Sequence, residues 1–120
     1  MALTELFSGI PVSDFETMVD WYERLWGRPP DFYPKPGEAV WQLTGHGWVY
    51  VVQDADRAGN GLMTLLVDNL ELLISELESR EIDPGKVKEL GPSVPGIVLT
   101  DSDGNRISFG QPPAESGESA

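Results

Sequence analysis

The chain lacks cysteine altogether and is poor in positive charge. Without cysteine there can be no disulfide, no thiolate zinc site and no cysteine nucleophile. Only 8 basic residues stand against 20 acidic ones, giving a formal net charge of -12. The chain therefore lacks the basic footprint that nucleic acids and anionic membranes require. The acidic excess is typical of a solvated surface, and it would also favour a cationic partner.

Long apolar runs are absent as well. No stretch approaches membrane-spanning length, and the N-terminus has no basic region followed by an apolar run. We therefore expect a soluble, cytoplasmic protein with no membrane or nucleic-acid partner. The 120 residues, 40% of them hydrophobic, suit one compact domain with a real core.

Histidine is scarce too, which limits catalytic chemistry. The single histidine, His46, lies between two glycines and could act as a general base, as a lone ligand or as a solvated turn residue. No patterned acid accompanies it, so we predict no catalytic residue. Asp54 and Asp56 start no series of calcium ligands, and the segment 101–105 lacks the later ligands of an EF-hand.

The N-terminal part predicts a strand over 6–12 followed by a helix. Ser13 and Glu16 fit a capping box, and Gly27 fits the left-handed residue that ends a helix. Apolar residues recur at helical spacing between them, at Phe15, Met18, Val19, Tyr22, Leu25 and Trp26.

The rest of the chain predicts a loop, a hairpin and a second strand–helix unit. The expected elements are a loop over 31–38, hairpin strands over 39–44 and 48–53, a strand over 62–67, a helix capped by Asp68 or Asn69, and strands over 94–100 and 106–110. The tail over 113–120 is small, polar and Pro-rich, and is expected to be disordered.

Two halves of the sequence match at an offset of about 55 residues. IPVSDFETMVDWYERL resembles TLLVDNLELLISELES, and GHGWVYVV resembles DGNRISFG. Each half reads as strand, helix and about three strands, so internal duplication sets the architecture. We predict an α+β fold in a single domain over 1–112, with module one over about 3–56 and module two over about 60–111.

The ordered motifs carry a family resemblance. V-S-D-F, W-Y-x-x-L-x-G, the duplicated copy and the closing D-x-D-G-N-x-I-x-F resemble the vicinal oxygen chelate superfamily. This is the group of glyoxalases, bleomycin resistance proteins and extradiol dioxygenases. The resemblance implies two βαβββ modules with mixed sheets curled around a central cavity, and a homodimer.

The resemblance also places four metal-ligand positions, and here the sequence departs from the family. These positions fall at Phe7, Val51, Leu62 and Ser108. Three of these side chains offer no donor atom, and one hydroxyl is a poor ligand. We therefore expect no metal and no cofactor. The resemblance then indicates the members that bind and sequester small molecules without a metal, such as bleomycin-binding resistance proteins.

Strand alternation extends these positions into a predicted cavity wall. The expected wall residues are Phe7, Gly9, Gln42, Val49, Val51, Gln53, Leu62, Thr64, Val98, Ser108 and Gly110. They would line a small-ligand pocket or, alternatively, fill an ordinary core. Phe32 and Tyr33 are expected at the cavity rim, whereas Trp48 and Tyr50 are expected to face the helices.

Three functions stay open. The leading hypothesis is a metal-independent protein that binds a small molecule of cationic or aromatic character and sequesters a toxic or antibiotic compound. The second is a lyase, isomerase or dioxygenase-type enzyme with atypical metal ligands. The third is a scaffold or regulatory module with a filled cavity.

Overall fold

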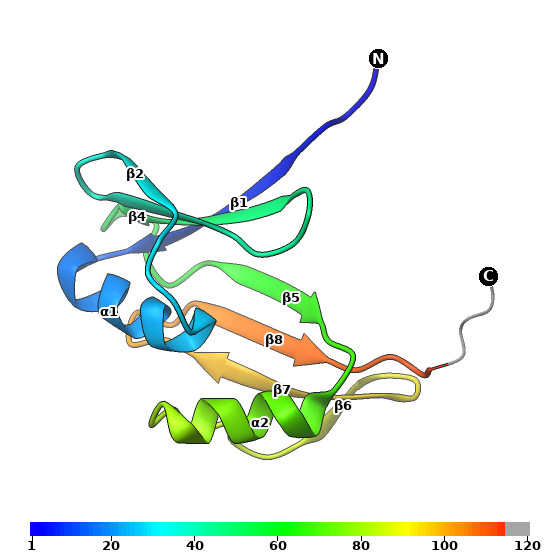
Figure 1. Cartoon of the computed structure of the whole chain (residues 1–120). Coiled ribbons are helices and arrows are strands. Elements are labelled where there is room, and N and C mark those ends of the chain that lie inside the picture. The colour runs from blue at the N-terminus through cyan, green and yellow to red at the C-terminus, as the bar shows by residue number, and fades with distance from the viewer. Residues whose placement is uncertain (115–120) are drawn as a thin grey trace. The chain divides into compact units, whose positions relative to one another are not determined.

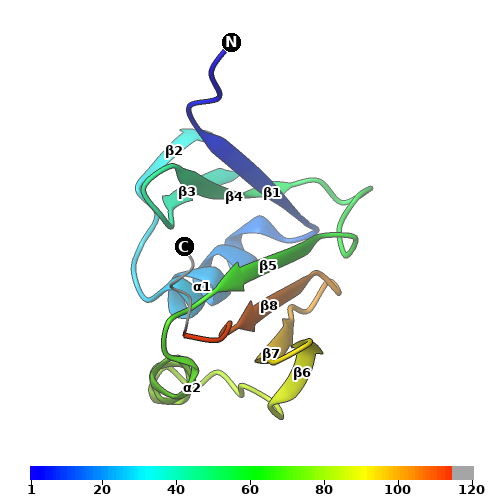
Figure 2. The same cartoon turned by 90° about the vertical axis from the view of Figure 1, so that its right-hand side faces the viewer.

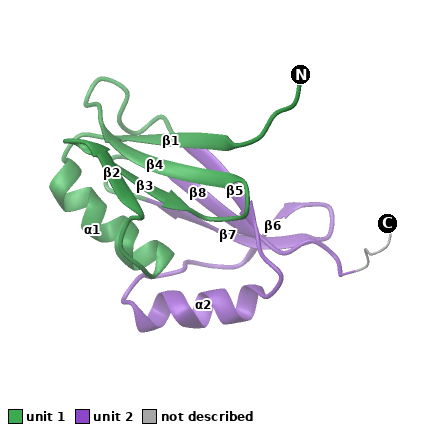
Figure 3. Cartoon of the chain, turned by 45° about the horizontal axis from the view of Figure 1, so that its top comes forward, with its two compact units in different colours: residues 1–61, 101–105 green, residues 62–100, 106–120 purple. Residues whose placement is uncertain are grey.

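The computed structural model describes residues 1–114 and divides into two compact units (Figures 1 and 3). The first unit contains residues 1–61 and the short segment 101–105, and the second contains residues 62–100 and, within the described part of the chain, 106–114. The predicted disordered tail lies mostly outside the described residues.

The first unit is a four-stranded mixed sheet with one helix. Its elements are β1 (Leu6–Val12), α1 (Phe15–Trp26), β2 (Phe32–Lys35), β3 (Glu38–Gln42) and β4 (Gly47–Gln53). The strand order is β1-β4-β3-β2, with β1 parallel to β4 and the other pairs antiparallel (Figure 2).

The second unit repeats this arrangement. Its elements are β5 (Leu62–Leu66), α2 (Leu70–Ser79), β6 (Lys88–Gly91), β7 (Val94–Thr100) and β8 (Arg106–Gly110). The strand order is β5-β8-β7-β6, and again the first and last strands pair in parallel (Figure 2). The predicted α+β fold of two βαβββ modules is confirmed, whereas the central cavity stays a prediction.

The predicted loop over 31–38 is wrong in part, because it contains β2. This strand pairs only with β3 and forms the edge of its sheet. An edge strand tolerates the missing amide hydrogen of Pro34, so the proline that indicated a loop does not prevent pairing. The short strand β6 was likewise not located by the sequence pattern.

The start of α1 differs from the predicted capping box by one residue. Asp14 is the N-cap, and its carboxylate accepts the amide hydrogen of Thr17. Ser13 instead donates its amide and its hydroxyl to the Asp103 carboxylate, at 3.0 and 2.5 Å. The end of the helix is as predicted, with Gly27 in the left-handed region at a φ of 84°.

A glutamine at the end of β4, and another directly after β8, reinforce the duplication. The side-chain oxygen of Gln53 accepts the amide hydrogen of Phe15 at 2.8 Å, and that of Gln111 accepts the amide hydrogen of Leu70 at 2.7 Å. Phe15 and Leu70 are the first residues of α1 and α2. Each module therefore satisfies a free amide at the start of its helix with the same residue type.

The turn over 101–105 is organised by two buried polar residues. Asp101 Oδ1 accepts the amide hydrogens of Asp103, Gly104 and Asn105, at 2.9 to 3.0 Å. Asp101 Oδ2 accepts the Tyr22 hydroxyl at 2.7 Å and the Asn105 side-chain amide at 2.9 Å. Burial, and next the hydrogen bond to Asp101, raise the pKa of Tyr22 far above its ordinary value.

Asn105 connects the same turn to two other segments. Its side-chain amide donates to the Pro11 carbonyl at 2.8 Å, and its side-chain oxygen accepts the Gly61 amide hydrogen at 2.7 Å. The closing D-S-D-G-N motif therefore stabilises the first unit by joining this turn to Pro11, Tyr22 and Gly61 through hydrogen bonds.

Neither α1 nor α2, the helices of the described part of the chain, has the length and apolar character needed to span a bilayer.

Candidate ligand-binding site

The first sheet presents one face to α1 and leaves the other open. Trp41 and Val49, opposite each other in the register of β3 and β4, are fully buried. The Trp41 indole donates to the carbonyl of Arg28, just beyond α1, at 2.9 Å. The alternate residues of β4, among them Trp48, therefore point to the open face.

The open face carries a pair of stacked aromatic rings. Phe7 and Trp48 are partners in the parallel pairing of β1 and β4. Their ring centroids are 5.3 Å apart with an interplanar angle of 11°. Phe7 retains 48% of its surface exposed. An exposed stacked pair presents a flat apolar surface on which a planar ligand can lie.

The alternation predicted for β4 is wrong by one residue. Val49 and Val51 are both 0% exposed and lie on the face that carries Trp41, not on the face of Phe7. Val49 and Val51 are core residues against α1, whereas Trp48 and Tyr50, which were expected to face the helices, lie on the open face. The physical reason is the register: Phe7 pairs with Trp48 and Gly9 with Tyr50.

Gln53 also lies away from the open face. Its side chain accepts the amide hydrogen of Phe15 and donates to the Ser13 carbonyl at 2.8 Å. Both hydrogen-bonding groups are thus committed to the start of α1. The predicted wall residue is a helix-capping residue.

Phe32 extends the aromatic surface, and we call Phe7, Phe32, Trp48 and Tyr50 the aromatic platform. The Phe32 ring lies edge-on to Trp48, with centroids 6.3 Å apart and an interplanar angle of 72°. Phe32 is 45% exposed. Tyr33 is 57% exposed on the same strand. Gln42 pairs with Trp48 and therefore shares the platform face.

Gly9 makes room for the fourth ring. A Cβ at this position would lie 2.6 Å from Cζ and 2.7 Å from the hydroxyl oxygen of Tyr50, closer than real contacts allow. The Tyr50 ring therefore lies across the glycine, next to the stacked pair on neighbouring residues of β1 and β4.

Gly9→Ala is expected to displace the Tyr50 ring from the platform. Because the atoms in the way are the far end of a side chain, the ring can rotate, and the unfolding free energy should change by less than about 1 kcal/mol. A crystal structure together with urea unfolding checks both points. An unmoved ring, or a much larger destabilisation, would contradict this account.

A carboxylate lies at the edge of the platform. Glu5 Oε1 accepts the Trp48 indole N–H at 2.7 Å, and Glu5 Oε2 lies 3.2 Å from His46 Nδ1. The hydrogen bond from Trp48, and next the contact with His46, hold the pKa of the Glu5 carboxyl below its ordinary value. The His46 side chain is 83% exposed, in keeping with a solvated turn residue. The platform is thus bordered by a negative charge at neutral pH.

The second sheet has its own open face, and here the predicted alternation is right. Leu62 pairs with Arg106, Thr64 with Ser108, and Val98 with Ser108. Ile107 and Phe109, which alternate with Ser108 on β8, are buried. Leu62, Thr64, Val98, Ser108 and Gly110 therefore share one face, and Leu62 is 70% exposed.

The register also corrects one of the four metal-ligand positions. Gly9 pairs with Tyr50 in the first module as Thr64 pairs with Ser108 in the second, so the counterpart of Ser108 is Tyr50. The alignment of GHGWVYVVQ with DGNRISFGQ, each ending in the capping glutamine, already contained this signal. Sequence reasoning missed it because it assigned the ligand position to Val51, one residue beyond the one that the alignment places opposite Ser108.

These residues do not fit a resident metal ion. The four positions carry Phe7, Tyr50, Leu62 and Ser108, which together offer a phenol and a hydroxyl where a divalent ion needs carboxylates or imidazoles. Within residues 1–114, no three histidine, aspartate or glutamate side chains are gathered so that they could hold a metal.

Comparison with known proteins places this fold. A glyoxalase/bleomycin resistance protein from Catenulispora acidiphila DSM 44928 is 35% identical, with a TM-score of 0.86, over 92% of this chain and 100% of that one. TnmS3, an antibiotic binding protein from Streptomyces sp. CB03234, is 22% identical with a TM-score of 0.72 over 94% and 99%. A bleomycin-binding protein complexed with bleomycin is 20% identical with a TM-score of 0.64 over 94% and 100%.

Neither a scan of family models nor a search of curated proteins gives a match. The two βαβββ modules nevertheless define the vicinal oxygen chelate class. Within it, the identity and coverage of the Catenulispora structure show that the chain belongs to the glyoxalase/bleomycin resistance protein family.

Proposed function

We propose that the chain is a metal-independent binding protein that sequesters a flat, aromatic and cationic small molecule on the aromatic platform. The observation that carries this proposal is the exposed stack of Phe7 and Trp48 with the Glu5 carboxylate at its edge. Flat rings gain stacking and burial on such a surface, and a positive charge gains attraction to both the ring faces and the carboxylate. The net charge of -12 acts in the same direction.

Metal independence is supported by the donor set. A phenol and a hydroxyl at the family's ligand positions give a divalent ion little to bind. The antibiotic-binding and bleomycin-binding proteins of the same fold support sequestration over catalysis. No observation favours the enzyme or the scaffold hypothesis over binding.

A homodimer is part of this proposal. Leu62 and Leu66 on the open face of the second sheet are 70% and 66% exposed, and Leu6 at the start of β1 is 70% exposed. Leu62 and Leu66 share one face of β5, and adjoining exposed apolar side chains are typical of surfaces that meet another protein. We further propose a cytoplasmic location.

The test is a titration of chelator-treated protein with ethidium, a flat aromatic cation, and with bleomycin A2. Because Trp48 lies in the platform, its fluorescence should change in a saturable way. ANS, an aromatic anion, should bind at least about tenfold more weakly, because Glu5 repels it. Failure of both cations to bind the metal-free protein would contradict the proposal.

Ethidium binding is expected to weaken at acid pH. The lowered pKa of Glu5 means that its carboxylate is charged throughout the neutral range and becomes protonated only as the pH falls through that lowered value. The attraction for the cation is therefore complete at neutral pH and lost below the ordinary glutamate range. Glu5→Gln, which keeps an acceptor for Trp48, should bind weakly at all pH values and remove the pH dependence. A wild-type acid profile in Glu5→Gln would exclude Glu5 as the cause.

A further inference from the structure

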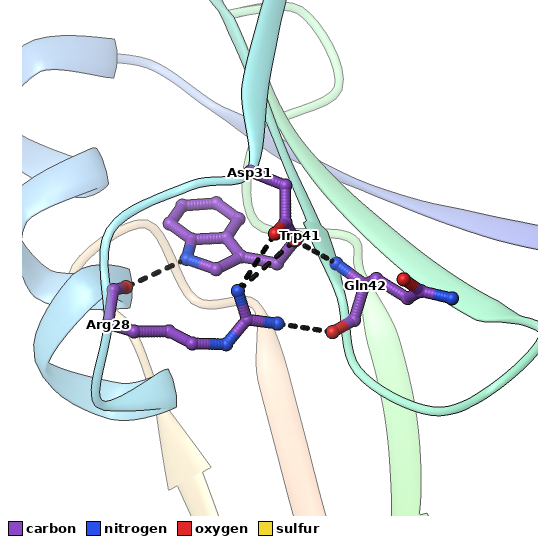
Figure 4. A network of polar contacts seen from close by, with 4 residues as sticks. All are labelled: Arg28, Asp31, Trp41 and Gln42. Carbon is purple, nitrogen blue, oxygen red and sulfur yellow. Dashed lines mark hydrogen bonds and ion pairs between the residues drawn. The ribbon is translucent and has the colours of Figure 1, made fainter.

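A compact polar network joins the segment before β2 to the end of β3 (Figure 4). Arg28 Nη1 donates to Asp31 Oδ1 and Oδ2, at 3.1 and 3.2 Å, and Arg28 Nη2 donates to the Gln42 carbonyl. The Asp31 carboxylate also accepts the Gln42 amide hydrogen at 2.6 Å. We call Arg28, Asp31 and Gln42 the Asp31 bridge. Beneath it, the Trp41 indole donates to the Arg28 carbonyl.

The strand that follows this bridge is otherwise weakly held. β2 has four residues, all exposed, and lies at the edge of the sheet. Its register with β3 contains two partner pairs, Phe32 with Val40 and Lys35 with Glu38, with an irregularity between them. The Asp31 amide donates to the Val40 carbonyl at 2.7 Å, directly before the strand. The Asp31 bridge therefore supplies most of the hydrogen bonds that hold the chain next to Phe32.

Both ends of the bridge adjoin platform residues. Asp31 precedes Phe32 in the chain, and Gln42 is the register partner of Trp48. The bridge therefore fixes the backbone at Phe32 relative to the backbone at Trp48. The edge-on contact of Phe32 with Trp48, at 6.3 Å, depends on this spacing.

We propose that Arg28 and Asp31 are positioning residues that hold Phe32 edge-on to Trp48 and thereby set the width of the platform that a ligand meets. The consequence for ligand selection rests on the proposed function, whereas the positioning of the ring does not.

The Asp31 bridge contributes more to the position of Phe32 than to the free energy of unfolding. The side chains of Arg28 and Asp31 are 43% and 38% exposed, and exposed ion pairs contribute little to folding. The hydrogen bond from the Gln42 amide, and then Arg28, keep the pKa of Asp31 below its ordinary value. The bridge is therefore intact at neutral pH, where ligand would bind.

The direct test is NMR of the free protein. Asp31→Ala should move the ring-proton shifts of Phe32 toward their values in an unstructured chain, because Trp48 no longer shields them. Asp31→Ala should also speed the hydrogen exchange of the backbone amides of residues 31 and 42 by about tenfold, while the amides of β4 stay protected. The matched control is Asp54→Ala, which removes the Asp54–Arg57 ion pair in the turn after β4. Unchanged Phe32 shifts in Asp31→Ala, or an equal change in the control, would overturn the proposal.

The second test is a double-mutant cycle with ethidium. Asp31→Ala and Arg28→Gln should each weaken ethidium binding by about tenfold in the wild type, and by less than about twofold in a Phe32→Ala background. An equal loss in both backgrounds would mean that the bridge does not act through Phe32. If wild-type protein binds no ethidium, the proposed function fails, and the NMR result still decides whether the bridge positions the ring.

Discussion

Asp101→Ala is expected to lower the free energy of unfolding by about 3–4 kcal/mol. The carboxylate accepts five hydrogen bonds, and its residue is only 5% exposed. Removing it leaves the amides of Asp103 and Asn105 and the Tyr22 hydroxyl without their acceptor, and Asn105 and Tyr22 are buried away from water. The Gly104 amide still donates to the Asp101 carbonyl. Urea unfolding followed by circular dichroism measures the loss.

Two neighbouring variants calibrate this result. Tyr22→Phe removes one of the five donors and should cost about 1 kcal/mol. Asp103→Ala removes the partner of Ser13 at a more exposed position and should also cost about 1 kcal/mol. If Asp101→Ala lowered the free energy of unfolding no more than these two variants do, the hydrogen bonds of Asp101 would not be a main source of the first unit's stability.

Trp48→Leu is expected to weaken ethidium binding by about a hundredfold, with little loss of stability. Trp48 contacts Phe7 by stacking and Phe32 edge-on, so it is the centre of the aromatic platform. Removing a central ring takes away the stacking surface and leaves Glu5 without its indole donor. Isothermal titration calorimetry measures the affinity, and thermal unfolding verifies the fold.

The matched control is Trp21→Leu. Trp21 lies on α1 and contacts Tyr22, so its replacement removes the same side-chain volume far from the platform in the sheet. Ethidium affinity should stay within about twofold of wild type in this variant. Equal affinity in Trp48→Leu and wild type would show that the ligand binds elsewhere.

Much of the fold followed from local patterns. The strands over 6–12, 94–100 and 106–110, the helix end at Gly27 and the duplication are all as predicted. They were accessible because apolar periodicity, turn residues and repetition depend on nearby residues alone. β2 escaped prediction because Pro34 and the exposure of all four residues are typical of a loop.

The site was predicted less well, because it depends on register. The predicted register of β4 was wrong by one residue. Because alternate residues point to opposite faces of a strand, the prediction placed Val49 and Val51 on the face that Trp48 and Tyr50 occupy. The Glu5–Trp48 and Asp31–Gln42 contacts join residues 43 and 11 positions apart, through hydrogen bonds that no sequence period marks. In the second module, where the register was right, Leu62, Thr64, Val98 and Ser108 do share a face.

A native mass spectrum of protein purified without added metal or chelator tests the central claim most directly. The account predicts a homodimer whose mass contains no stoichiometric metal and which binds ethidium with the same affinity before and after chelator treatment. A stoichiometric metal that disappears with chelator, taking ethidium binding with it, would contradict metal-independent binding on the aromatic platform.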